Sequence, residues 1–317
     1  MDLVNGISGL IPVLKPTGMT STEVSRLISK RFGRLKLGHV GTLDPDADGV
    51  LPILVGQATK LQDYLLEMPK VYSFEFKLGV ATDTLDASGR VVKEADWGHV
   101  TADMVTAIVS RFLGPITQTP PIFSAVKYKG KELYKYARSG LEAEDMPLES
   151  LNRTVEIASL KVDACKLPFI QMTVECSKGT YVRTLAFDLA EALGSTGHVT
   201  KLTRTMSAGF GLKDCISIEH IQDQGTSLSA LLVPFDSLAI GLPTWYLDDM
   251  VLLKRLIDGQ TVVVSMADHA LPTLNYPAHV LLKSRDNRSV GVVSAMLQEN
   301  GQIRLHLKRG FQCHQAS

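Results

Sequence analysis

Residues 38–49 of this chain read GHVGTLDPDADG, and residues 50–55 continue as the apolar run VLPILV. A proline after Asp44 disfavours helical geometry at that aspartate, and Asp48-Gly49 is a common turn pair. The apolar run is typical of a buried strand. The pattern therefore predicts a stiff loop that carries three aspartates and is anchored on the core, a common place for catalytic groups. A plain turn with solvated aspartates, or a weak cation-binding loop, fits the same pattern.

The composition is that of an ordinary globular chain of 317 residues, long enough for one large domain and a small one. Hydrophobic residues make up 45% of the chain and its net charge is zero, so a polyanionic partner has to be inferred from local charge. No apolar run reaches the ~18 residues of a membrane span and the start does not resemble a signal peptide, so we expect a cytoplasmic protein. The four cysteines form no CxxC pair and no HExxH occurs, which gives no support for a metal or redox site.

The residues before the acidic loop predict a basic helix. Thr20 and Glu23 fit a capping box, and apolar residues recur at helical spacing over the following turns. The segment from Arg26 to Lys36, both included, carries five positive charges and no acid, and this run ends just ahead of the acidic loop. A polyanion site beside the aspartates explains these charges, and a solvated helix face explains them equally well.

Two further segments place functional candidates on regular structure. Residues 70–80 alternate between apolar and polar, which predicts a strand with Tyr72 on its buried face. Residues 171–176 predict another strand, and residues 181–193 predict a helix with an apolar face. Arg183 falls in the first turn of that helix, where its charge opposes the helix dipole. Pairing with a buried acid therefore explains Arg183 better than helix stability does.

Residues 123–138 interleave four lysines and one arginine with three tyrosines. Cations for phosphates and aromatic faces for unstacked bases are typical of a contact to single-stranded RNA, although a solvated basic helix has a similar composition. Beyond a predicted linker at 241–245, the pattern indicates a small β domain. Its expected elements are a helix at 250–257 and strands at 278–283, 289–296 and 302–308.

Several motifs follow one another between residue 15 and about residue 215: KPTGMTS at 15–21, the acidic loop and its continuation at 38–60, residues 78–89, residues 120–138 and SKGTYVRTL at 177–185. Together they resemble the TruB family of tRNA pseudouridine synthases. The last seventy residues resemble, in place and size, the PUA-type RNA-binding domain of bacterial members. The resemblance implies an α+β fold: a pseudouridine-synthase catalytic domain at 1–245 with a mixed or antiparallel central sheet flanked by helices, an RNA-gripping insertion at about 120–150, and a small PUA-like β domain at 246–317.

The implied reaction is the isomerisation of uridine to pseudouridine at position 55 in the T arm of tRNA, after the base is flipped out, with no cofactor and no metal. The resemblance identifies Asp44 as the essential carboxylate and Arg183 as its partner. It identifies Tyr72 as the residue that stacks on the base and is a candidate for removing the C5 proton, although an ordinary tyrosine pKa near ~10 favours stacking. Asp44 either attacks C1′ or removes a C2′ proton, and the sequence leaves both routes open.

Further residues are implied as substrate contacts. His39 fills or buttresses the space that the base leaves, and Tyr181 and Leu202 line the uracil pocket. The candidates for phosphate contacts are Lys15, Lys127, Lys129, Lys135 and Arg138. For each residue an ordinary structural role is the alternative. The chain departs from the family where Thr203 replaces one of two adjacent arginines and where residues 207–209 read Ser-Ala-Gly, both of which would weaken an RNA contact.

The implied partner is tRNA, with no membrane, no required protein partner and a monomeric enzyme. Three other functions fit parts of the sequence. A non-catalytic RNA chaperone would share the fold, but it would not need Asp44 beside Arg183. A dyskerin-like, guide-RNA-dependent synthase would share the catalytic domain, but we expect a longer basic tail in that branch. A metal hydrolase would use Asp44, Asp46 and Asp48, but the intervening proline and the lack of further ligands argue against it.

Overall fold

The computed structural model describes residues 7–141, 143–265 and 275–311 of the chain. Its larger sheet has ten strands: β1 (Gly9–Lys15), β2 (Leu37–His39), β3 (Asp48–Val55), β4 (Lys70–Leu78), β7 (Gly114–Gln118), β10 (Arg153–Lys166), β11 (Phe169–Cys176), β12 (Gly197–Ser207), β13 (Phe210–Gly211) and β14 (Val233–Pro234). The order is β14–β1–β3–β12–β4–β11–β10–β7, with β13 beside β12 and β2 beside β3. Among these described strands, β3 and β12 pair in parallel and the other pairs are antiparallel. The predicted α+β class with a mixed central sheet is confirmed.

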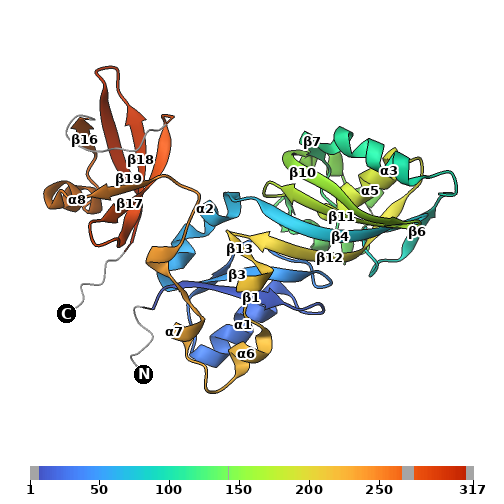
Figure 1. The fold of residues 1–317 in the computed structure, drawn as a ribbon, viewed down its shortest axis with the longest axis horizontal. Coiled ribbons are helices and arrows are strands. Elements are labelled where there is room, and N and C mark those ends of the chain that lie inside the picture. The colour runs from blue at the N-terminus through green and yellow to red at the C-terminus, as the bar shows by residue number, and fades with distance from the viewer. Residues whose placement is uncertain (1–6, 142, 266–274, 312–317) are drawn as a thin grey trace.

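Helices flank this sheet in two groups (Figure 1). The α-helices of this larger, N-terminal part are α1 (Ser21–Phe32), α2 (Gln62–Glu67), α3 (Ala102–Ile108), α4 (Leu133–Ala137), α5 (Val182–Ala192), α6 (Ile218–Gln222) and α7 (Leu228–Leu231). Helices α1, α6 and α7 share an apolar core with β1 and β3, and α3 and α5 share another with β4, β10 and β11. The 3-10 helices are η1 (Gly56–Leu61), η2 (Val109–Phe112), η3 (Ala143–Asp145), η4 (Leu148–Leu151), η5 (Leu212–Asp214) and η6 (Phe235–Ser237). No helix among the described residues is long and apolar enough to cross a membrane.

Local sequence signals explain where the elements next to the loop begin and end. The capping box of α1 is formed: Glu23 N donates to Thr20 Oγ1 at 3.1 Å, and Thr20 N donates to Glu23 Oε2 at 2.7 Å. The predicted strand at 70–80 is divided, because Gly79 has a φ of 94° and its N–H turns to Thr196 O. Residues beyond this glycine form the hairpin β5 (Val80–Thr82) and β6 (Val91–Glu94). The helix predicted to begin at Tyr181 begins one residue later, because Tyr181 is extended and occupies the N-cap.

The insertion (residues 120–150) forms a small unit of its own between β7 and β10. It contains the hairpin β8 (Lys127–Tyr128) and β9 (Lys131–Glu132), followed by α4, η3 and most of η4. Ile122, Leu133 and Met146 form its apolar centre. The segment therefore has a separate core and is connected to the large sheet through its two ends.

The C-terminal β domain contains β15 (Thr244–Leu247), α8 (Met250–Ile257), β16 (Val262–Ser265), β17 (Ala278–Ser284), β18 (Ser289–Leu297) and β19 (Gln302–Gly310), with the sheet order β15–β17–β18–β19–β16. Figure 1 shows it beside α2. Its helix and three of its strands lie where the sequence predicts them. Leu281, Val292 and Phe311 share an apolar cluster with Leu54 and Ala58 of the larger part, so the two parts are packed together.

The C-terminal boundary of the predicted linker at 241–245 is wrong, because strand β15 already begins at Thr244. Thr244–Leu247 is strand β15, which pairs in parallel with β17, and the Trp245 side chain is buried in the core of the small domain. Gly241 and Pro243 are ordinary linker residues, and the four-residue strand that follows is too short to show a period of two. We therefore propose a domain boundary at 241–243, ahead of β15 and not within it.

Candidate active site

The loop at 38–49 lies where the two halves of the sheet meet. Strand β3 contacts β12 through two register pairs, Thr203 with Asp48 and Arg204 with Gly49. Gly49 has a φ of 107°, and a Cβ at this position would lie 2.2 Å from the carbonyl oxygen of Arg204. Glycine is therefore required here on two grounds, its φ and the close approach of the two backbones. The acidic loop is held against the sheet at its C-terminal end.

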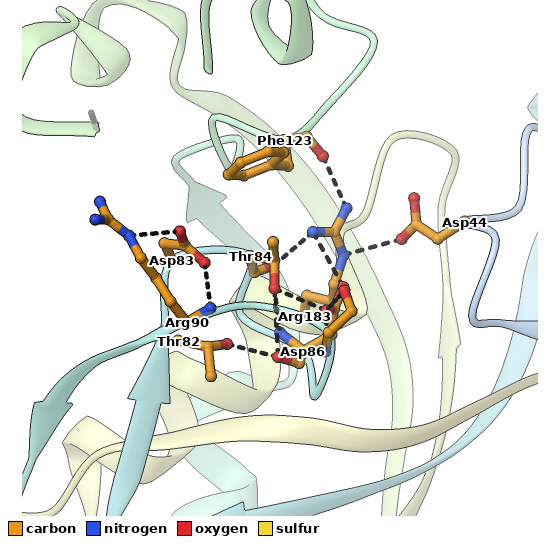
Figure 2. Close-up of polar contacts among 9 residues, drawn as sticks. Asp44, Thr82, Asp83, Thr84, Asp86, Arg90, Phe123 and Arg183 are labelled. Atoms are coloured by element: carbon orange, nitrogen blue, oxygen red, sulfur yellow. Dashed lines mark hydrogen bonds and ion pairs between the residues drawn. The ribbon is translucent and has the colours of Figure 1, made fainter. Parts of the chain in front are cut away.

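Arg183 and Asp44 form an ion pair at this junction (Figure 2). Nε of Arg183 lies 2.9 Å from Oδ2 of Asp44, although its N–H is not aligned as a hydrogen bond. The Arg183 side chain is 4% exposed, whereas that of Asp44 is 39% exposed. The pair therefore joins a buried cation to a carboxylate that remains accessible from outside.

Three further contacts, made by groups other than Asp44, hold the Arg183 guanidinium in place (Figure 2). Nη1 donates to Thr84 O at 2.6 Å, and Nη2 donates to Phe123 O at 2.9 Å. Oδ2 of Asp86 lies 3.6 Å from Nη1. Asp86 is itself held, because its Oδ1 accepts hydrogen bonds from Thr84 Oγ1 at 2.7 Å and from the hydroxyl of Ser88 at 2.6 Å. The fork of a guanidinium suits this task because it presents donors in several directions at once.

Asp86 and Phe123 are site residues that the sequence analysis did not single out. The turn at 82–89 offers two acids, and nothing in the sequence distinguishes them. In the structure, Asp83 pairs with exposed Arg90 at 3.0 Å, and Asp86 faces Arg183. Phe123 contributes a carbonyl group, which any residue type carries. Only the path of the chain reveals such a contact.

A cavity of about 270 Å³ opens beside the pair. Its charged lining residues are Asp44, Asp46, Asp86, Arg183 and Lys201, and the predicted pocket residue Leu202 contributes to an apolar wall. The volume lies just below the ~300–1,000 Å³ typical of ligand sites. Among the described residues, no group of three or more His, Cys, Asp or Glu side chains is arranged to hold a metal ion.

Tyr72 lies on β4 and packs against the same two apolar cores as Leu202. Burial raises the pKa of the Tyr72 phenol, and the nearby guanidinium of Arg204 opposes that rise. The structure thus brings Tyr72 and Leu202 together, with the phenol in its neutral form at neutral pH.

His39 and Tyr181 are not joined to the Asp44–Arg183 pair by any contact within the described residues. Nε2 of His39 lies 3.1 Å from Thr42 Oγ1, and burial lowers the pKa of the imidazole. The ring of Tyr181 faces the Arg153 guanidinium at 5.2 Å, and its backbone N–H donates to Gln118. Both side chains are partly buried, and neither lines the cavity beside Asp44.

The cations predicted on the insertion are exposed. Lys129 Nζ lies 5.2 Å from the ring centroid of Tyr128, and the Arg138 guanidinium lies 5.3 Å from that of Tyr134. Lys135 pairs with Glu132 at 2.7 Å. Lys127 is exposed on β8. The insertion therefore presents cations stacked on aromatic faces, and the Phe123 carbonyl connects its first residues to Arg183.

Lys15 requires a correction, because the structure does not place it on the surface. Its side chain is fully buried, and Nζ donates to the carbonyl oxygens of Pro16 at 2.9 Å, Met19 at 2.6 Å and Pro45 at 3.1 Å. A phosphate cannot reach an ammonium with no exposed surface. Lys15 instead ties the segment at 15–19 to the residue that follows Asp44, and we propose a positioning role in place of the expected phosphate contact.

The burial of Lys15 predicts a pH-dependent stability difference. Burial lowers its pKa from 10.5 to about 8, so between these pH values the unfolded chain holds a proton that the folded protein lacks. The free energy of unfolding therefore gains a term that rises with pH from about 8 to about 10.5. Wild type should become more stable relative to Lys15→Met over this range, as measured by denaturant titration. Parallel pH profiles for the two proteins would contradict the assignment.

Comparisons with known proteins identify the family of the chain. Residues 29–182 match the TruB family pseudouridylate synthase N-terminal domain, and residues 183–239 match the tRNA pseudouridylate synthase B C-terminal domain. The chain is 44% identical to tRNA pseudouridine synthase B of Geobacter sulfurreducens, over 73% of this chain and 76% of the relative. It is 41% identical to the protein of the same name from Caldanaerobacter subterraneus subsp. tengcongensis, over 81% and 86%.

Solved structures share the fold. A chain of a Cbf5-Nop10-Gar1 complex superposes with a TM-score of 0.73 at 24% identity, covering 96% of this chain and 85% of the other. The fold and the matches define a pseudouridine synthase, an enzyme of the isomerase class. Within that class the chain belongs to the TruB family.

Proposed function

We propose that this protein converts uridine to pseudouridine at position 55 in the T arm of tRNA, with Asp44 as the essential carboxylate. The observation that carries the proposal is the Asp44–Arg183 pair beside a nucleobase-scale cavity. The names of the relatives support tRNA as the substrate. A non-catalytic RNA chaperone would gain nothing from a carboxylate held in the cavity, because an acid repels phosphate.

The reaction needs no external reagent. The C1′–N1 bond of uridine breaks, a C1′–C5 bond forms, the C5 proton is lost and N1 gains a proton. In one route Asp44 attacks C1′ and carries the sugar as an ester while the detached base turns. In the other, Asp44 removes the C2′ proton as the base leaves, and returns it later. Both routes require the carboxylate at a fixed position, which the buried Arg183 provides.

The target base has to leave the RNA stack before Asp44 reaches its sugar. Leu202 lines the cavity, and Tyr72 packs against the same apolar clusters as Leu202. We propose that these two residues supply the apolar and aromatic surfaces that receive the base. Because burial raises the pKa of Tyr72, its phenol stays protonated at neutral pH, and we propose that this residue stacks on the base and does not take the C5 proton.

We propose that RNA is held by the exposed cations of the insertion and by the C-terminal β domain, which would act as a PUA-like RNA-binding domain. The relatives at 36–44% identity are named tRNA pseudouridine synthase B, which favours an enzyme that works alone as a monomer over a guide-dependent particle. A tRNA substrate would place the enzyme in the cytoplasm.

The decisive test is incubation with unmodified tRNA in the presence of a chelator, followed by nucleoside mapping. We expect pseudouridine at position 55 and no requirement for metal. Absence of pseudouridine would disprove the activity, and conversion at another position would disprove the site.

The charge of the insertion gives a prediction about salt dependence. For each protein, the logarithm of the RNA-binding constant is plotted against the logarithm of the salt concentration, which gives a negative slope. Lys127→Gln should make this slope less steep by about 0.7, the value for one single-stranded phosphate contact. Lys166→Gln is the matched control, since Lys166 is exposed at the end of β10 that lies opposite the insertion. RNA-binding titrations at several salt concentrations measure both slopes. Equal slopes for all three proteins would remove Lys127 from the RNA surface.

A further inference from the structure

Arg204, on β12, is 1% exposed and is among the largest fully buried side chains of the described chain. A guanidinium retains its charge in proteins, so its burial is costly unless its N–H groups find acceptors. Nε donates to Val50 O at 2.7 Å, and Nη2 donates to Gly41 O at 2.9 Å. One buried side chain therefore binds the residues on both sides of Asp44, before and after the acidic turn.

The loop backbone closes onto Arg204 at two glycines. At Gly41, with a φ of 77°, a Cβ would lie 3.1 Å from Nη1 of Arg204. At Gly49, a Cβ would lie 2.2 Å from the carbonyl oxygen of the same residue. The path of the loop is thus shaped around both the side chain and the backbone of Arg204.

Arg204 also faces Tyr72. The antiparallel register pairs Arg204 of β12 directly with Tyr72 of β4, and side chains of directly opposed residues lie on the same face. Burial raises the pKa of Tyr72, while the nearby charge of Arg204 acts against that rise. The same residue therefore binds the Asp44 loop and lies opposite the tyrosine proposed to stack on the base.

We propose that Arg204 is a positioning residue that holds the Asp44 loop and Tyr72 in register, and that it makes no contact with RNA. The inference rests on the proposed function of Asp44. A lysine cannot substitute, because one ammonium does not present the divergent donors that reach Gly41 and Val50 together. Misplacement of a catalytic group by about 1 Å costs on the order of 10²-fold in rate.

The test compares Arg204→Gln and Arg204→Lys with Val105→Ala. Val105 is a buried apolar residue of α3, a helix that carries none of the proposed site residues, so its truncation controls for a loss of stability alone. Single-turnover rate constants at saturating tRNA should fall about 10²-fold in both Arg204 variants and remain at the wild-type level in the control, with RNA affinity unchanged throughout. The Tyr72 phenol, followed by tyrosine absorbance against Tyr72→Phe, should titrate at higher pH without Arg204.

Gly41→Ala disturbs the same contact from the loop, because the added Cβ would lie 3.1 Å from Nη1 of Arg204. This variant keeps the test decisive if Arg204→Gln does not fold. Like Arg204→Lys, Gly41→Ala should lower the single-turnover rate constant. Wild-type rates in any folded Arg204 variant, or an unchanged titration of Tyr72, overturn the inference. If the wild-type protein forms no pseudouridine, the proposed function fails instead, and the tyrosine titration still reports on Arg204.

Discussion

Asp44→Asn should abolish pseudouridine formation while leaving tRNA binding intact. The amide keeps the size of the side chain but can neither attack C1′ nor accept the C2′ proton, so the turnover rate should fall by at least about 10³-fold. Affinity should be retained, because removing an acid from a phosphate-binding cleft takes away repulsion. Nucleoside analysis after extended incubation, together with binding titrations, measures the two effects separately.

Asp46→Asn is the matched comparison for this variant. Asp46 belongs to the same loop and lines the same cavity, but it is exposed and forms no ion pair with Arg183 among the described contacts. We expect its rate to stay within about tenfold of wild type. Retained turnover in Asp44→Asn would show that the carboxylate is not essential. Equal losses in both variants would show that the loop contributes negative charge and no specific chemical group.

The sequence predicted the parts of this site whose chemistry is unusual for their position. An aspartate fixed by a following proline and an arginine in the first turn of a helix both stand out locally, and the structure places them 2.9 Å apart although they are far apart in the chain. The strands and helices with clear periodicity, including α8 and β17 to β19, were also predictable.

The remaining features depend on contacts that sequence patterns do not encode. Lys15 and Arg204 are charged residue types that are usually found at the surface, but both are buried and bind backbone carbonyls. No pattern in the sequence predicts this burial. Asp86 differs from Asp83 only in the direction that the turn gives it. Burial of a cation is decided by the three-dimensional path of the chain, so a family motif can identify the residue and still leave its role open.

Arg183→Lys should lower the turnover rate by about 10²- to 10³-fold, although the charge is kept. An ammonium cannot bind Thr84 O, Phe123 O and the Asp44 carboxylate together, so the carboxylate loses its fixed position. Arg183→Met should lose more, and its free energy of unfolding should drop by about 3 kcal/mol, because buried acceptors are left without a donor. Arg309→Lys, which alters an exposed pair with Asp63, is the control and should change stability by less than about 0.5 kcal/mol.

A double-mutant cycle separates a shared catalytic role from two independent ones. If Arg183 acts through Asp44, the variant that combines Asp44→Asn with Arg183→Met should be no slower than Asp44→Asn alone, because the second change removes the support of a group that is already inactive. Multiplicative losses would instead assign Arg183 a contact of its own with the RNA or with the flipped base. Single-turnover rates of the four proteins, with unfolding curves recorded on the same samples, decide between the two outcomes.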